Sequence, residues 1–273
     1  MLDFMMKTIY ALFLFIAFAL PVTAQQTIEL GENYYDDVKG IVYDREFTVD
    51  IKLHTNGYAL GVNIARLKTY YLTNFFNIEF GEIQHPKQFR QSFDFRPSAN
   101  GKVSRAFVFG KQNNFFVLRG GMGQKRYFSE KAKRKGLAIG MSYSGGVSLG
   151  LLKPYYLELN YPESSTNDII TRSEKFSEEN AAVFLDITRI FGASSFTRGL
   201  SELSVVPGGH GRVAVHFDWG AFDQFVKALE AGVMIDFYFQ EVPIMVESPL
   251  VENVENRPLF INLFLNLQLG KRK

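Results

Sequence analysis

The sequence predicts an all-β fold, a transmembrane antiparallel β-barrel of about ten strands with a helical insertion between the seventh and eighth. Three observations carry this prediction. Most of the chain consists of segments in which apolar and polar side chains alternate. After the first 24 residues no run of about 18 apolar residues occurs, so no transmembrane helix is expected. The chain also combines 15% aromatic residues with 23 glycines, which suits membrane interfaces and strongly curved sheets.

The alternation is clearest near the C-terminus, in residues 259–269. Its odd positions are all aliphatic, whereas its even positions are Phe, Asn or Gln. A period of two places the aliphatic side chains on one face of a strand and the amides on the other. About eleven residues cross a bilayer when the strand is tilted. We expect this last strand to pair with the first, because a barrel must close.

The N-terminal region indicates export. Residues 1–24 have the features of a secretory signal peptide, because Lys7 precedes a short apolar run and small residues surround Ala24, where cleavage is expected. The apolar run is too short to cross a membrane. Residues 25–44 are polar and are expected to form an N-terminal extension before the barrel at 45–273.

Ten alternating segments are expected to form the strands. The dipeptide Asn56-Gly57 between the first two is the strongest short signal for a hairpin. The segments are 46–55, 58–65, 76–81, 105–111, 114–126, 137–149, 155–161, 212–219, 229–239 and 259–269.

Alternation stops within an insertion at about 162–208. There Val183, Phe184 and Ile187 recur at helical spacing, and Ser177 is a plausible helix start because acidic residues follow it. We therefore expect a helix at 177–191, which would cap the barrel, plug its lumen or bind a partner.

The lengths of the connections predict the sidedness. An even number of strands places both termini on one side, as in bacterial single-chain barrels, whose periplasmic turns are short and outer loops long. A miscount of one strand would invert the assignment, and a secreted β-sandwich would also alternate. Short connections are expected at 66–69, 112–113, 150–153 and 220–225, and long ones at 84–103, 127–135, 160–208 and 240–256.

A resemblance supports the barrel. Five segments resemble a family of uncharacterised outer-membrane β-barrel proteins of Bacteroidota, and the C-terminal Leu-Gly-Lys-Arg is similar to the ending common in that family. The resemblance implies the fold and an outer-membrane location, but it brings no established activity and no catalytic residue. The segments are 53–64, 83–90, 108–127, 199–213 and 226–248.

Charged residues of both signs fall on the polar faces of the strands, which are expected to face the lumen. In a narrow barrel such charges pair and fill the interior more often than they conduct ions. We expect a lumenal polar network of Asp50, Glu79, Arg119, Arg212, His216, Asp218, Glu230 and Asp236.

A basic link is a second candidate site. It would contact lipopolysaccharide phosphates on an outer loop, or anionic partners on the inner side, and it could equally be a solvated turn. Its charges are Lys131, Lys133, Arg134 and Lys135.

No catalytic, cofactor or metal site is expected. His216 and Asp218 share a strand face and could activate water, but membership of the lumenal network is the favoured interpretation. A Ser–His–acid hydrolase would be expected to carry a G-x-S-x-G elbow, which the sequence lacks. The four His are dispersed, there is no Cys, and the glycines around Met122 have no helix after them to bind a nucleotide.

These observations predict a non-catalytic protein of the bacterial outer membrane, exported by the Sec route. It would be a structural or accessory subunit of an envelope assembly or transport machine. A small-solute channel is the alternative, and a lumenal or rim hydrolase acting on lipid or peptide comes third. The expected partners are outer-membrane lipid, lipopolysaccharide and envelope proteins. The net charge of +2 argues against nucleic acid.

Overall fold

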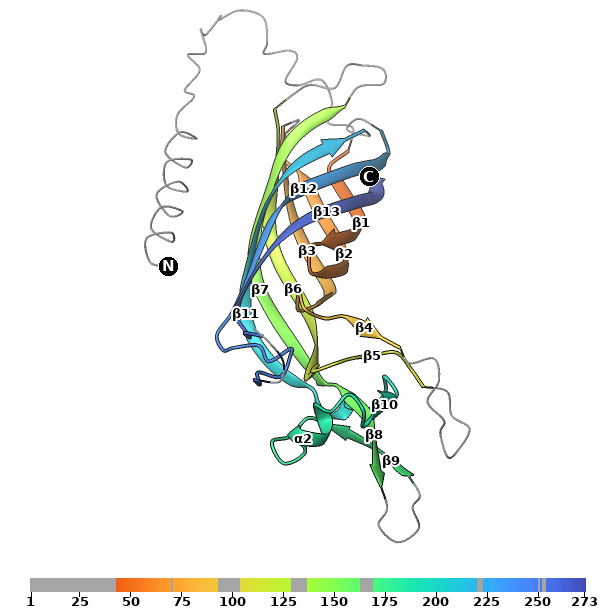
Figure 1. Cartoon of the computed structure of the whole chain (residues 1–273). Helices are drawn as coiled ribbons and strands as arrows, with labels where there is room; N and C mark the ends of the chain where they lie inside the picture. Colours follow the sequence, from red (N-terminus) through yellow and green to blue (C-terminus); the bar gives the residue numbers. More distant parts are fainter. Residues whose placement is uncertain are drawn as a thin grey trace, which may run out of the picture. The chain divides into compact units, whose positions relative to one another are not determined.

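Eight antiparallel strands close into a barrel in the computed structural model (Figure 1). Their order around the barrel is β1-β13-β12-β11-β7-β6-β3-β2. The first and last strands pair, as expected, with Val49 opposite Leu269. The strands are β1 (Arg45–His54), β2 (Gly57–Leu67), β3 (Leu72–Ile83), β6 (Asn113–Tyr127), β7 (Ala138–Pro154), β11 (Ser204–Asp218), β12 (Phe225–Tyr238) and β13 (Leu259–Arg272).

The barrel belongs to the second of two units into which the chain divides, 41–273. The predicted signal peptide, nearly all of the N-terminal extension and the four charges of the basic link lie outside the described residues. The structure describes 43–69, 71–92, 104–128, 137–162, 169–219, 223–249, 251 and 254–273.

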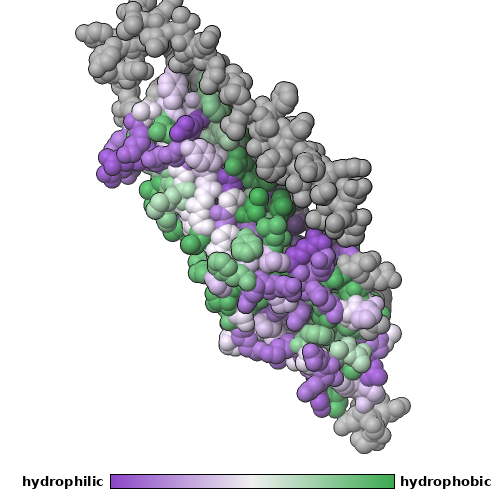
Figure 2. Space-filling model, turned by 90° about the vertical axis from the view of Figure 1, so that its left-hand side faces the viewer, coloured by the Kyte–Doolittle hydropathy of each residue, from purple (hydrophilic) through white to green (hydrophobic). Residues whose placement is uncertain are grey.

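The barrel strands are apolar on the outside and polar on the inside. In β1, Leu53 faces outward and is 62% exposed, whereas the neighbouring Lys52 faces the lumen and is 1% exposed. The same alternation continues in β13, where the odd-numbered Leu and Ile residues are exposed. On the face seen in Figure 2, apolar side chains gather over the middle of the wall and polar ones toward its ends. Apolar side chains outside and polar side chains inside are the reverse of the arrangement in a soluble protein.

The two ends of the barrel differ in the length of their connections. The end that holds the first and last strand termini has the links 68–71, 128–137 and 219–224. The opposite end has the β1–β2 hairpin and the long links 84–112, 155–203 and 239–258. The predicted hairpin at Asn56-Gly57 is confirmed, since β1 ends at His54 and β2 begins at Gly57.

The predicted count of about ten barrel strands is wrong. β5 (Phe107–Val108) pairs with β4 (Arg90–Gln91), and β8 (Tyr156–Pro162) pairs with β9 (Ile169–Lys175) and β10 (Ile190–Ala193). The segments expected as the fourth and seventh strands therefore lie outside the barrel. Both alternate, but β7 already runs 17 residues, and β8 then leaves the wall to form a separate three-stranded sheet.

Because these two segments are not barrel strands, one link lies at the opposite end of the barrel from the one predicted. The basic link, expected among the long outer loops, joins β6 to β7 at the end that holds the termini. The predicted short turns at 112–113 and 150–153 do not exist as barrel turns, because residue 113 begins β6 and 150–153 continue β7.

The predicted helix at 177–191 is also wrong. Within the described part of the insertion only α2 (Ala181–Phe184) and the 3₁₀ turn η1 (Leu200–Glu202) are helical. The side chain of Asp186 accepts hydrogen bonds from the backbone N–H and the hydroxyl of Thr188, which forms a local turn after α2. Phe184 instead packs in an apolar cluster with β8 and Phe107. No helix among the described residues has the length and apolar character required to span a membrane.

Candidate functional site: the barrel lumen

The interior of the barrel holds a dense set of charged side chains. All eight residues predicted for the lumenal network are buried there, because each occupies an inward position of its strand. The inward positions also carry Glu46, Lys52, Lys125 and Arg272. Among the described residues, the lumen therefore contains six carboxylates and five cationic side chains besides His216.

Glu79 on β3 is the centre of the first group of ion pairs. One carboxylate oxygen accepts from Arg119 Nη1 at 2.7 Å, and the other accepts from Lys52 and, at 3.4 Å, from Arg212 Nη1. Arg119 also binds Asp236 through two hydrogen bonds of 2.6 and 2.9 Å. Side chains from β1, β3, β6, β11 and β12 thus meet across the lumen, and a bidentate arginine pair fixes their geometry.

A second group lies nearer the end with the termini. Glu46 pairs with Lys125 at 3.1 Å and with Arg272 at 2.8 Å. Arg272 continues to Asp218 at 2.7 Å, and Asp218 also accepts from the Tyr127 hydroxyl at 3.1 Å. The first and last barrel strands are therefore joined by side chains as well as by their backbone ladder.

Neutral side chains and His216 connect the remaining carboxylates. Asp50 accepts hydrogen bonds from Asn63 at 2.6 Å, Asn266 at 2.9 Å and Gln268 at 3.0 Å. Asn266 also donates to Glu230 at 3.0 Å. These amides satisfy carboxylate oxygens that would otherwise be costly to bury.

The arrangement around His216 differs from a water-activating pair. Its Nδ1 lies 3.1 Å from Glu230, and its Nε2 lies 3.2 Å from the Tyr127 hydroxyl. Asp218 is bound to Arg272 and Tyr127, and both His216 and Asp218 are buried. Among the described residues no cluster of three or more potential metal ligands occurs.

Four charged members of the network, Glu46, Lys52, Lys125 and Arg272, were not predicted from the sequence. Lys52 and Lys125 lie on inward positions of predicted strands, so the alternation could have identified them. Glu46 opens the first predicted strand and has the same parity as Asp50. Arg272 lies beyond the predicted end of the last strand, which continues through it.

An apolar cluster closes the lumen at the end opposite the termini. Inward side chains of β3, β6, β7, β11 and β12 meet three residues of the β12–β13 loop there. The loop is held in place because Gln112 N and Asn113 N donate to Ile244 O at 2.9 and 3.1 Å. The cluster consists of Ile83, Phe115, Val117, Leu152, Val206, Tyr238, Val242, Ile244 and Met245.

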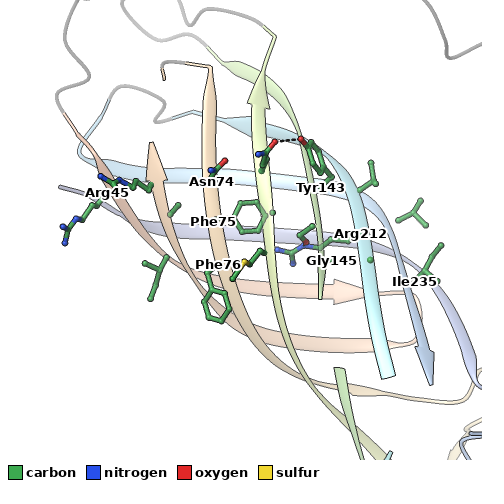
Figure 3. A pocket seen from close by; sticks show the side chains of 18 residues that line it. Arg45, Asn74, Phe75, Phe76, Tyr143, Gly145, Arg212 and Ile235 are labelled. Carbon is green, nitrogen blue, oxygen red and sulfur yellow. Dashed lines mark hydrogen bonds between the residues drawn. The ribbon is translucent and has the colours of Figure 1, made fainter. Parts of the chain in front are cut away.

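A hollow of about 1140 Å³ is lined by side chains of the barrel wall (Figure 3). Phe75 of β3 faces Arg212 of β11, whose guanidinium carbon lies 5.7 Å from the ring centroid, while Phe76 points away (Figure 3). Tyr143 donates a hydrogen bond to Gln124 at its edge. The lining is mainly apolar and brings together no acid–base set.

Comparisons with known proteins add little. No protein-family model matches the chain, and no curated protein matches it. One solved structure similar to this chain is the N-terminal β-barrel domain of Pseudomonas aeruginosa OprF, with 9% sequence identity and a TM-score of 0.33. The match covers 85% of this chain and 98% of that one. A likeness this weak carries no argument, so the closed barrel is established by the strand pairing of this chain alone.

Proposed function

We propose that this chain is an outer-membrane β-barrel protein that crosses the membrane without forming an open pore and acts without catalysis, as a structural or accessory subunit of an envelope assembly or transport machine. The observation that carries the proposal is the reversed polarity of the barrel, with apolar side chains outside and paired charges inside.

The outward face supports the membrane location. Large apolar residues on all eight barrel strands are exposed, including Leu60, Leu263 and Val147 at 58%, 63% and 68%. Monomeric soluble proteins rarely expose apolar patches beyond a few hundred Å². Lipid tails would cover this surface, and the resemblance to barrels of Bacteroidota supports the same location. The short links at the end with the termini support a periplasmic position for that end.

The paired charges and the apolar cluster inside the barrel support a role other than conduction. An ion crossing the barrel would have to break the pairs around Glu79 and pass the apolar cluster at Ile244. An eight-stranded barrel is just wide enough for side chains to fill it. Catalysis is disfavoured by the same packing, because the His216 ring nitrogens already have partners.

An accessory role is supported by the sheet outside the barrel. The β8-β9-β10 sheet and the turns around it expose Ile169, Ile187 and Leu200. Apolar side chains exposed on a domain outside the bilayer favour contact with another protein.

Envelope fractionation and gel migration test the location. The processed protein is expected in the outer-membrane fraction and should migrate differently before and after heating in detergent. Recovery as a detergent-free soluble protein would refute the membrane proposal.

Purified protein in planar bilayers tests the lumen separately. We expect no current above that of the bare bilayer, whereas a steady single-channel conductance would favour the small-solute channel. A complex with envelope proteins that survives detergent extraction would support the accessory role, and isolation of a bare monomer after mild extraction would count against it.

A further inference from the structure

A small cationic pocket lies on the outward side of the barrel, at the end opposite the termini. Its volume is about 410 Å³. Glu82, Asn114 and Lys153 line it from outward positions of β3, β6 and β7, and Asn114 lies directly opposite Lys153 in the strand register. Residues of the link on either side of β4 and β5, together with Tyr155 and Tyr156, form its walls.

The charges in this pocket are unbalanced. Arg90, Arg105, Lys111 and Lys153 line it, and Glu82 is the one carboxylate among its described lining residues. Glu82 is 4.0 Å from Lys111 Nζ and also accepts from a tyrosine hydroxyl of β2 at 3.2 Å. A single shared carboxylate leaves the pocket strongly positive.

Lys153 contributes a buried cation to this pocket. The residue is 2% exposed, and no carboxylate of the described residues forms an ion pair with it. Its Nζ instead lies 4.4 Å from the centroid of the Phe196 ring. A buried lysine without a carboxylate is costly, and the cation–π contact offsets only part of that cost.

Lys111 is a second buried lysine of the pocket. Its Nζ donates to Gln88 Oε1 at 3.2 Å and lies 5.5 Å from the centroid of the Tyr155 ring. Burial lowers the pKa of Lys111 to about 8, an effect that nearby Lys153 and Arg90 reinforce and that Glu82 opposes. A bound anion would raise the pKa of Lys111, which is opposite to the effect of these neighbouring cations.

The aromatic surroundings indicate where the pocket lies relative to lipid. Phe80 and Phe116 stack on the outward wall with centroids 5.9 Å apart, and Phe196 packs edge-on to Phe116 at 6.2 Å. Aromatic side chains of barrels concentrate at the membrane interface. The cationic pocket lies at the polar edge of this aromatic group, where a lipid headgroup would lie.

From this geometry we propose that the pocket formed by Arg90, Arg105, Lys111 and Lys153 binds a phosphate group on the headgroup of an outer-leaflet lipid. The buried lysines would contact the phosphate, and the exposed arginines would surround it at the mouth. The inference rests on the proposed membrane location, because it requires that this end of the wall meet the headgroups.

The test uses the processed full chain in phosphatidylcholine nanodiscs, with native mass spectrometry to measure bound lipid. The probes are lipid A carrying two phosphates, the same lipid without phosphates, and inorganic phosphate. We expect binding that depends on the phosphates and a reduction of about ten- to hundredfold in the Lys111→Gln/Lys153→Gln double variant, since each lysine would supply a charge-assisted contact.

Lys175→Gln is the matched control, because Lys175 lies on β9 of the sheet that contributes Tyr156 and Ala193 to the pocket, but it pairs with Glu202 outside the pocket. It should bind like the unaltered protein, and folding of every variant is checked by heat-dependent migration. Equal binding of both lipid forms, or unchanged binding by the double variant, would overturn the proposal. Inorganic phosphate that binds as tightly as the lipid and displaces it would overturn the lipid source. These outcomes leave the membrane location intact, which the fractionation tests on its own.

Discussion

Replacing Glu79 with Gln would remove the charge at the centre of the lumenal network and keep the side chain's size. Lys52, Arg119 and Arg212 all contact this carboxylate, and all four side chains are at most 4% exposed. After the change Arg119 keeps Asp236, whereas Lys52 and Arg212 lose their carboxylate partner in the described network. We therefore expect a large loss of stability.

The magnitude follows from what remains buried. Removing one partner of a buried ion pair costs about 3–5 kcal/mol, because the other charge stays desolvated without compensation. The free energy of unfolding should fall by about this amount in Glu79→Gln. Adding Lys52→Met should restore part of the loss, since one of the uncompensated cations is removed as well.

Urea unfolding in detergent micelles measures the effect. The chain contains a single tryptophan, Trp219, so its fluorescence reports on the barrel without interference from others. Glu255→Gln breaks an exposed ion pair and should produce no measurable change. A Glu79→Gln protein as stable as the unaltered one would refute the view that these pairs hold the lumen closed.

Three further predictions concern other parts of the barrel. Lys111→Met should raise the free energy of unfolding at pH 7 by about 1–3 kcal/mol, because it removes a buried charge whose pKa in the folded protein is lowered to about 8. This advantage should vanish as the pH rises from about 8 to about 10.5, where the folded protein has released the lysine proton and the unfolded chain still keeps it. A stability difference that stays constant across this pH range would contradict the prediction. Gly146→Val should abolish heat-dependent migration, because even a Cβ would overlap the Gly120 carbonyl and come 2.5 Å from Gly121 Cα, whereas Gly120→Ala should migrate normally, having nothing within 4 Å. Ile244→Asp should loosen the closed mouth at a cost of several kcal/mol, seen as an earlier urea midpoint.

Much of the barrel could be predicted because its strands alternate with a two-residue period. One face of each strand needs apolar side chains and the other needs polar ones, so the alternation is regular. The residues of β13 show this, since an aliphatic wall and an amide-lined interior leave little choice of register. The same period misled at Tyr156–Pro162, which alternates equally well but buries Leu157 and Leu159 against an outer cluster. Periodicity identifies a strand with two unlike faces, and it does not say which sheet the strand joins.

The lumenal residues could be predicted, but their pairing could not. Arg272 shows why, because its partners Glu46 and Asp218 come from strands far away in the sequence. The cationic pocket had no local signal either. Its four basic residues are spread from Arg90 to Lys153, and they meet because the link between β3 and β6 folds back beside Lys153 of β7.

The central claim is that the outward faces of these strands contact lipid tails. The chain has no cysteine, so Leu265→Cys provides a single site for a fluorophore on the outward face of β13. In vesicles containing lipids with a quencher on the acyl chain, we predict strong quenching of this label. A label that the acyl-chain quencher leaves bright, and that a water-soluble quencher reaches, would contradict the account.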